Sequence, residues 1–275
     1  MTEVKKINLL LLPGLLNDAR LFQFQTRDLS DMTHATVADL TVADTVEELA
    51  ASVLEHAPPK FALAGLSMGG YVALEIMRQA PERVLGLALL DTSARPDTAE
   101  ASAMRLKLME QAETNFQVVL DNLMPKLVHP AHMTYNSIID SIYSMGHRIG
   151  KDAFVRQQRA IMWRIDSRPH LTKISPCPTM VLCGRQDVIT PVEVHKELAA
   201  AIPGSRLVVV EECGHLSTMG QPKLVSDALR VWLRGIGSSK NAWFHLPRET
   251  LTAKGALPGA YPSSIPAPRE IHCVA

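Results

Sequence analysis

Short apolar runs recur along the chain, and each has the length of a strand rather than of a helix. Most are apolar at every position, which is typical of strands covered on both faces. Segments with apolar residues at helical spacing lie between them. This alternation predicts an α/β fold, a mostly parallel sheet of about six strands flanked by helices. The expected strands are Ile7–Leu12, His34–Asp39, Phe61–Leu66, Val84–Leu90, Thr179–Cys183 and Arg206–Val210.

Capping residues and prolines mark the expected helices. Thr45 and Glu48 have the spacing of a capping box. Thr190, followed by Pro191 and Glu193, is typical of a helix start, with Thr190 as the cap. The expected helices span residues 45–56, 68–79 and 221–233, and a further one begins at Thr190.

One stretch, from about Ala94 to Leu171, interrupts the alternation because it contains no convincing strand. Apolar residues recur in it at helical spacing, so we expect a helical insertion there. Six of the 12 methionines fall in this stretch. Methionine is flexible and polarizable, so these side chains suit an adaptable apolar wall, although plain packing explains each of them equally well.

The final segment, residues 237–275, differs from the rest. It holds five of the 18 prolines, and no apolar period continues through it. We therefore expect one domain over residues 1–236, followed by an extended or disordered tail.

Charge and composition exclude several classes of protein. Lys+Arg and Asp+Glu both number 28, so the net charge is zero, which argues against binding to nucleic acid or to an anionic membrane. Four cysteines are too few for a disulfide scaffold, and we expect a reducing compartment, the cytoplasm. The apolar run after Lys6 ends at Pro13 with no cleavage site, so it predicts a strand rather than a signal peptide. No run approaches the roughly 18–20 apolar residues of a membrane span, and nothing indicates an oligomeric state.

The segment GLSMGG, residues 65–70, carries the most informative pattern. It lies between an expected strand and an expected helix, where a G-x-S-x-G serine occupies a sharp, strained turn. Gly65 and Gly69 avoid clashes at the close approach that this turn creates. The turn exposes the Ser67 hydroxyl above a helix N-terminus, where negative charge is favoured. Ser67 is therefore the candidate nucleophile.

A serine hydroxyl needs a base, and the base needs an orienting acid. His215 and Asp187 each follow an expected strand, as Ser67 does, and the carboxyl ends of parallel strands share one edge of the sheet. The chain order Ser, Asp, His suits this topology. None of the other nine histidines combines a strand end with that order. Asp91, at the end of another expected strand, remains an alternative acid.

Acyl transfer also requires hydrogen-bond donors for the oxyanion. The amide of Met68, directly after the nucleophile, and the amide of Leu15, after Pro13-Gly14, are the candidates. Val188 and Leu216 lie beside the acid and the base in sequence, and we expect them to line the acyl pocket. No Cys/His spacing indicates a metal, and this chemistry needs no metal or cofactor.

Four segments together resemble the α/β-hydrolase fold family: LLLLPGLLNDARLF, LAGLSMGGYVALEI, MVLCGRQDVITP and VVEECGHLSTMGQP. The resemblance covers about residues 6–235 and is greatest to small bacterial esterase-like or lactonase-like members, including those similar to pimeloyl-carrier methyl esterases. It implies a Ser67, Asp187 and His215 triad with the two amides as oxyanion donors. It also implies that the insertion is a helical cap, residues 94–171, which covers the site and selects substrate.

The chain departs from the family pattern in three places, one of which, Gln221 in place of a frequent glutamate after the catalytic histidine, carries no mechanism. Pro13 replaces a histidine that often precedes the oxyanion-loop glycine, which leaves the donor amide intact. The sequence also begins directly at the strand before this loop. The first hairpin of the family is therefore expected to be missing, which leaves about six strands rather than eight.

These features predict a serine hydrolase that cleaves a carboxylic ester, lactone or thioester of a small, mainly aliphatic acyl substrate. The same triad also serves carbon–carbon bond hydrolysis, which would require Arg164 or Arg168 to face the site and bind a carboxylate. Cofactor-free perhydrolysis is a second alternative. A ligand-binding module without turnover is a third.

Overall fold

The computed structural model describes residues 6–174, 176–236, 251–253 and 270–271. Six strands in the order β6-β5-β4-β3-β1-β2 form the body of the sheet. Every neighbouring pair among them is parallel, which confirms the predicted sheet. The strands are β1 (Ile7–Leu12), β2 (Thr33–Ala38), β3 (Phe61–Leu66), β4 (Val84–Leu90), β5 (Thr179–Gly184) and β6 (Arg206–Val210).

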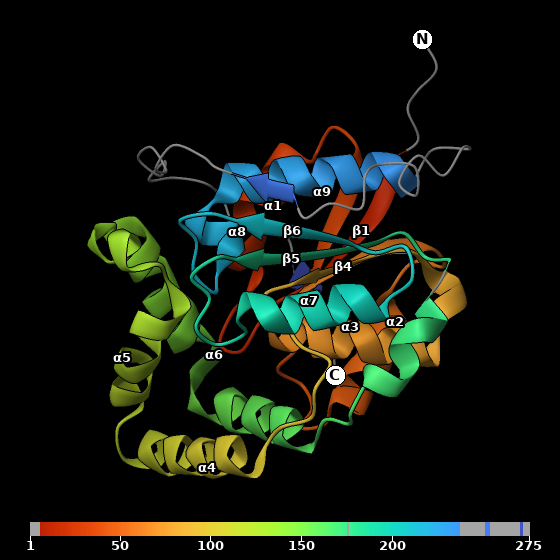
Figure 1. Cartoon of the computed structure of the whole chain (residues 1–275). Coiled ribbons are helices and arrows are strands. Elements are labelled where there is room, and N and C mark those ends of the chain that lie inside the picture. The colour runs from red at the N-terminus through yellow and green to blue at the C-terminus, as the bar shows by residue number, and fades with distance from the viewer. Residues whose placement is uncertain (1–5, 175, 237–250, 254–269, 272–275) are drawn as a thin grey trace.

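Helices cover both faces of this sheet (Figure 1). One face carries α1 (Gln23–Asp28) and α9 (Pro222–Ile236), with the single turn α8 (Ser217–Gly220) beside them. The other carries α2 (Val46–His56), α3 (Met68–Gln79) and α7 (Val192–Ala201). Thr45 accepts the Glu48 amide at 3.1 Å, so the predicted N-cap of α2 is present.

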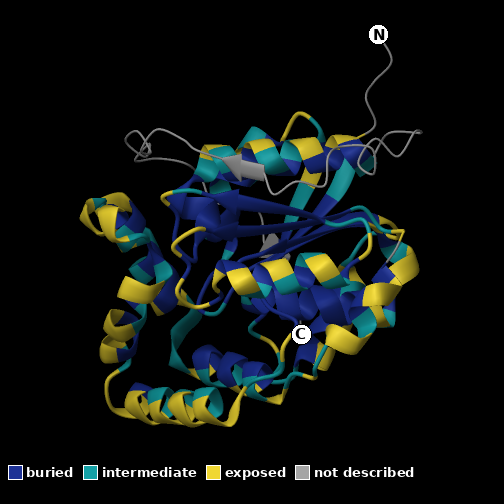
Figure 2. Cartoon of the chain, viewed as in Figure 1, coloured by how far each residue is buried: buried dark blue, intermediate teal, exposed yellow. Residues whose placement is uncertain are grey.

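The two-sided cover explains why most of the strands are apolar throughout. Successive side chains of a strand point to opposite faces. Leu10 and Leu12 accordingly pack into the core beneath α2 and α3, whereas Leu9 and Leu11 pack into the core beneath α9. The four central strands β3 to β6 are buried almost throughout (Figure 2).

Two short strands extend the sheet at its edges. β7 (Leu251–Ala253) pairs with β6, and β8 (Glu270–Ile271) pairs with β2. Both belong to the segment expected to form an extended or disordered tail, most of which lies outside the described residues. The two strands beyond the expected six therefore come from the C-terminal segment.

The stretch between β4 and β5 is helical, as the sequence predicts, and lies over the carboxyl ends of the strands (Figure 1). We refer to it as the helical insertion. It consists of α4 (Ala99–Thr114), α5 (Phe116–Leu127) and α6 (Asn136–Trp163), with 3-10 turns at Pro130–Thr134 and Arg168–Ile174. Gly150, at φ 76° and ψ 171°, breaks α6 into two helical segments.

The close packing of α3 on β1 predicts an unusual response to alanine at Gly69. A Cβ there would lie 2.5 Å from the Leu12 carbonyl carbon and closer still to its oxygen. Alanine ordinarily favours a helix by about 1 kcal/mol over glycine. Because strand backbone cannot yield, we instead expect Gly69→Ala to lower the free energy of unfolding by about 2–3 kcal/mol, measured by urea denaturation.

Gly146→Ala in α6 is the matched control. The nearest atom to a Cβ at Gly146 is a methyl group at the flexible end of Leu120, at 2.7 Å. We expect the free energy of unfolding of this variant to lie within about 1 kcal/mol of the wild-type value. Equal losses in the two variants would contradict the role assigned to the Leu12 backbone.

Candidate active site

Ser67 occupies the turn between β3 and α3, at φ 54° and ψ −116°. An L-residue rarely adopts this conformation, which costs about 1–3 kcal/mol. The glycines around it permit the close approach that the turn demands. A Cβ on Gly65 would lie 2.5 Å from the carbonyl carbon of Gly69 and 2.8 Å from the Gly70 nitrogen. The local geometry therefore matches the turn predicted from the glycine spacing.

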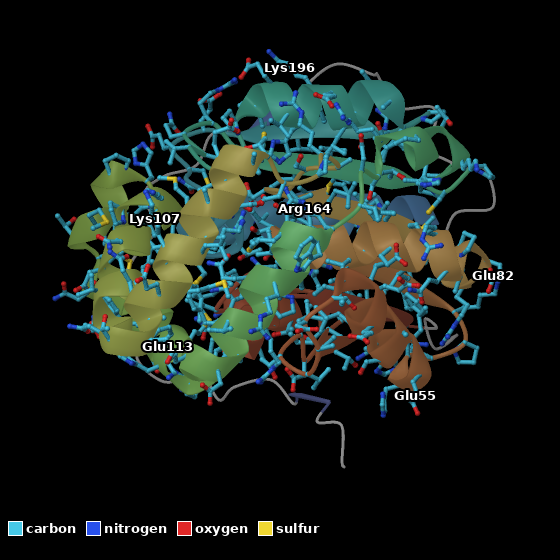
Figure 3. The ribbon with its side chains drawn as sticks, turned by 90° about the horizontal axis from the view of Figure 1, so that it is seen from below. Glu55, Glu82, Lys107, Glu113, Arg164 and Lys196 are labelled. Carbon is cyan, nitrogen blue, oxygen red and sulfur yellow. The ribbon has the colours of Figure 1, made fainter. Side chains whose placement is uncertain are left out.

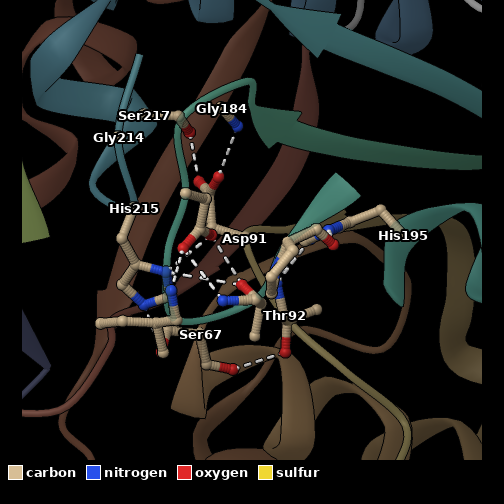
Figure 4. Close-up of polar contacts among 12 residues, drawn as sticks. Ser67, Asp91, Thr92, Gly184, His195, Gly214, His215 and Ser217 are labelled. Carbon is tan, nitrogen blue, oxygen red and sulfur yellow. Dashed lines mark hydrogen bonds and ion pairs between the residues drawn. The ribbon is translucent and has the colours of Figure 1, made fainter. Parts of the chain in front are cut away.

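A second contact supports this turn from behind. The Thr92 hydroxyl donates to the Ser67 carbonyl oxygen at 2.7 Å, and a Cβ on Gly70 would lie 2.6 Å from Thr92 Cβ. The Thr92 amide donates in turn to Nε2 of buried His195 at 2.9 Å, while His195 Nδ1 lies 3.2 Å from the Pro191 carbonyl oxygen (Figure 4). Burial lowers the pKa of His195 to about 4. Neutral His195 thus braces the turn, a role that the sequence did not indicate.

The structure brings the three predicted side chains into one hydrogen-bonded chain, of which Figure 4 labels Ser67 and His215. His215 Nε2 lies 2.9 Å from Ser67 Oγ, and His215 Nδ1 lies 2.8 Å from Asp187 Oδ2. Ser67 follows β3, Asp187 follows β5 and His215 follows β6. His215 and Asp187 are buried, and Ser67 is partly exposed. This is the geometry that proton transfer from a serine hydroxyl requires.

Further donors hold the Asp187 carboxylate in place. Its Oδ1 accepts the amides of Ile189 and Thr190 at 2.8 and 3.0 Å, and its Oδ2 accepts the Thr190 hydroxyl at 2.7 Å. The expectation that Thr190 caps a helix is therefore wrong, because α7 begins at Val192 with Pro191 at its N-cap. The hydroxyl that could have capped the helix binds the carboxylate instead.

Charge stabilises the contact between Asp187 and His215. Burial opposes ionisation of Asp187, but the adjacent imidazole and the donated hydrogen bonds outweigh it and hold its pKa below the ordinary value. Burial likewise opposes protonation of His215, yet the Asp187 carboxylate raises the pKa of the imidazole. The site thus favours an ionised acid beside an imidazole that can accept a proton.

Asp91, the alternative acid, lies behind this pair rather than on it. Its Oδ1 accepts the Gly184 amide at 2.9 Å, and its Oδ2 bonds to the Ser217 hydroxyl. The carboxyl is fully buried. Burial, reinforced by the negative charge of Asp187, raises the pKa of Asp91 to about 8. The structure therefore places Asp187, and not Asp91, against His215.

The loop after β1 passes beside Ser67, as expected for an oxyanion loop. A Cβ on Gly14 would lie 3.3 Å from Ser67 Cβ. The two amides that follow Leu15 are engaged, Leu16 with Gln157 Oε1 at 3.0 Å and Asn17 with the Gly14 carbonyl at 3.2 Å. The Leu15 amide has no such partner within the described part of the chain. As the first residue of α3, Met68 also has an amide without an intrahelical acceptor.

A cavity of about 520 Å³ opens onto Ser67 and His215 beneath the helical insertion. Its wall is mostly aliphatic. Leu216 contributes a buried side chain, whereas Val188 is 66% exposed and lies at the opening. Met104 and Met124 line the cavity, but Met145 packs in the core instead, so the methionine wall is smaller than the composition suggested. Further apolar lining comes from Leu108, Leu120, Leu123, Leu127, Ile142 and Ile161.

Arg105 and Gln158 also contribute to this wall, and sequence reasoning missed both. The Arg105 guanidinium donates to Asp97 at 3.1 Å and to Gln158 Oε1 at 2.8 Å. Its charge is thus neutralised by a carboxylate outside the cavity. Only the packing of α4 against α6 reveals these contacts, since neither residue stands in a recognisable motif.

The two arginines considered for carboxylate binding lie elsewhere. Arg164 donates to Asp97 at 2.9 Å and lies over the Tyr71 ring, 4.4 Å from its centroid, where α6 ends against the body of the protein (Figure 3). Arg168 pairs with Asp166 at 2.7 Å on the surface. Neither lines the cavity at Ser67.

Residues 6–174 and 176–236 hold neither a cluster of metal ligands nor a helix suited to a membrane. No group of three or more His, Cys, Asp or Glu side chains there could hold a metal ion. No helix in these ranges has the length and apolar character needed to cross a membrane. Cys177, Cys183 and Cys213 are free thiols.

A model of the alpha/beta hydrolase family matches residues 11–228. A pimeloyl-[acyl-carrier protein] methyl ester esterase of Aliivibrio salmonicida is 27% identical over 216 residues, 70% of this chain and 75% of that protein. RutD of Pseudomonas savastanoi, named as a carbamate hydrolase, is 28% identical over 164 residues, 58% of this chain and 61% of its own length. A thermophilic esterase from Thermogutta terrifontis, solved with malate bound, superposes with a TM-score of 0.78 at 30% identity over 85% of this chain and 92% of that chain.

The buried Asp91 carboxyl predicts how stability depends on pH. With a folded pKa of about 8 against an ordinary value of 3.8, the folded chain keeps a proton that the unfolded chain has released. This group therefore lowers the free energy of unfolding as pH rises from 4 to 8. Asparagine cannot titrate, and it preserves an acceptor for Gly184 and a donor for Ser217.

We expect the free energy of unfolding of Asp91→Asn, relative to the wild type, to increase between pH 5 and pH 8 by as much as about 4 kcal/mol. Urea denaturation of both proteins across this range measures it. A difference that stays constant with pH would show that the Asp91 carboxyl is already ionised at pH 5.

Proposed function

The chain belongs to the alpha/beta hydrolase family, and on that basis we propose that it is a serine hydrolase acting on a carboxylic ester, lactone or thioester. The observation that carries the proposal is the hydrogen-bonded chain from Ser67 through His215 to Asp187, which opens onto an apolar cavity. The esterases among its relatives support the ester class.

In the proposed reaction, Ser67 Oγ attacks the carbonyl carbon while His215 Nε2 accepts its proton. Asp187 keeps the remaining proton on Nδ1 and stabilises the imidazolium. The amides of Leu15 and Met68 donate to the oxyanion. His215 then protonates the leaving alcohol or thiol, and the same nitrogen activates the water that hydrolyses the acyl-enzyme.

The cavity supports a small, mainly aliphatic acyl group as substrate. We propose that the helical insertion acts as the cap over it, because α4, α5 and α6 supply most of the apolar wall. Two cationic side chains line the cavity, Arg105, which is paired with Asp97, and Lys126, which is exposed. Carbon–carbon hydrolysis needs a free cation for its carboxylate, and Arg164 and Arg168, the arginines considered for that role, lie away from the cavity. The mostly aliphatic wall therefore fits ester cleavage better.

Removal of the proposed nucleophile tests the reaction class. We expect Ser67→Ala to lower kcat for p-nitrophenyl butyrate by at least about 10³-fold and to abolish labelling by a fluorophosphonate. Circular dichroism should remain that of the wild type, because an alanine side chain fits within the space of serine. Turnover near the wild-type rate would rule out Ser67 as the nucleophile.

A pair of matched substitutions distinguishes the two carboxyls. Asp187→Asn places an amide where His215 requires an anion, and we expect kcat to fall by about 10³- to 10⁴-fold. Asp91→Asn replaces a neutral carboxyl with a neutral amide, and we expect kcat at pH 7 to stay within about threefold. Steady-state kinetics on the same ester gives both values. The reverse ranking would assign the acid to Asp91.

A further inference from the structure

Gln157, on the second helical segment of α6, joins the helical insertion to the oxyanion loop. Its side chain is fully buried. Its Oε1 accepts the Leu16 amide at 3.0 Å, and its Nε2 donates to the Leu40 carbonyl at 3.1 Å. We infer that Gln157 is a positioning residue that holds the Leu15 amide in place as an oxyanion donor. The inference rests on the proposed function.

The orientation of the Gln157 amide is determined by its partners. A backbone N–H can only donate and a backbone carbonyl can only accept, so Oε1 must face Leu16 and Nε2 must face Leu40. Both polar ends of the side chain are thereby satisfied without water. Oε1 therefore accepts the amide of Leu16, the residue directly after the proposed donor Leu15.

The loop needs such support because its conformation is strained. Leu16 has φ 59°, in the left-handed region that a leucine rarely occupies. A strained conformation persists only where surrounding contacts enforce it. The hydrogen bond from the Leu16 amide to Gln157 is the buried side-chain contact that does so. Without it, the loop can relax and carry the neighbouring Leu15 amide away from the oxyanion.

The first helical segment of α6 contacts the same part of the chain. Arg148 Nε donates to Asp18 Oδ2 at 2.9 Å, and Arg20 Nη1 donates to Ser144 Oγ at 2.8 Å. The break at Gly150 lies between these contacts and Gln157. Both segments of α6 therefore hold residues 16–20, and a displacement of the insertion would displace the oxyanion loop with it.

Gln157→Met tests the inference, since methionine has a similar length and volume but forms neither hydrogen bond. We expect kcat for p-nitrophenyl butyrate to fall about 10- to 100-fold, with KM within about twofold. The Ki of phenylboronic acid, whose tetrahedral adduct places an oxygen in the oxyanion site, should rise by a similar factor. If Gln157 had a purely structural role, the variant would show a lower Tm without a selective fall in kcat at nearly constant KM.

Gln157→Glu provides the rescue. Its buried carboxylic acid, while protonated, reproduces both hydrogen bonds, but the ionised form directs an anion at the Leu40 carbonyl. We expect kcat relative to the wild type to approach unity near pH 6 and to fall as the pH rises. Gln157→Met should show a ratio that does not change with pH.

Arg156→Met is the matched control. Arg156 Nε donates to the Thr41 carbonyl at 2.7 Å, so this variant removes a contact from the same helix to the residue after Leu40 without affecting Leu16 or the oxyanion loop. Its kcat should stay within about twofold. The inference is overturned if Gln157→Met retains kcat within twofold, changes KM alone, or shows only the loss seen in Arg156→Met. A wild type that hydrolyses no ester would instead refute the proposed function, and the inference with it.

Discussion

The strained backbone of Ser67 is the constraint on which the rest of the site depends. A φ of 54° directs the chain from β3 into α3 within one residue, and this is possible only where neighbouring side chains are absent. Gly65, Gly69 and Gly70 supply that space against backbone and against Thr92. This conformation costs about 1–3 kcal/mol. The packing of β3, which lies between β4 and β1 and between two hydrophobic cores, offsets that cost. A less well-packed strand could not hold the hydroxyl in this position.

Two buried carboxyls at the same sheet edge must differ in charge, because ionising both in a low-dielectric interior is unfavourable. Asp187 faces His215 and accepts three further hydrogen bonds from Ile189 and Thr190. Asp91 has one amide donor and one hydroxyl partner and no imidazole. Burial raises the pKa of both carboxyls, and the imidazole and hydrogen-bond donors around Asp187 outweigh it there and keep the negative charge on Asp187. Asp91 then acts as a neutral link between β5 and the turn after His215.

The strands and the three proposed catalytic side chains could be predicted because their signals are local. Ser67, Asp187 and His215 each stand at the end of an apolar run, and parallel strands bring such ends together. Thr190 shows the limit of local patterns. Its sequence context is typical of a helix start, but its hydroxyl donates to the Asp187 carboxylate instead of capping a helix. The strands β7 and β8 are too short to carry an apolar period. The contact of Leu16 with Gln157 joins positions 141 residues apart, which no spacing reveals.

Two adjacent residues of the helical insertion, Gln157 and Gln158, make different contacts. Gln157 bonds to the oxyanion loop, whereas Gln158 faces Arg105 in the cavity wall. A helix presents neighbouring residues about 100° apart, so one helix can support the loop with one face and shape the cavity with the next. In the proposed mechanism, substrate preference can therefore change through the cavity face while the loop contact stays constant. A shift of the whole helix, by contrast, would alter both at once, and this couples the fit of the acyl group to the placement of the oxyanion donor.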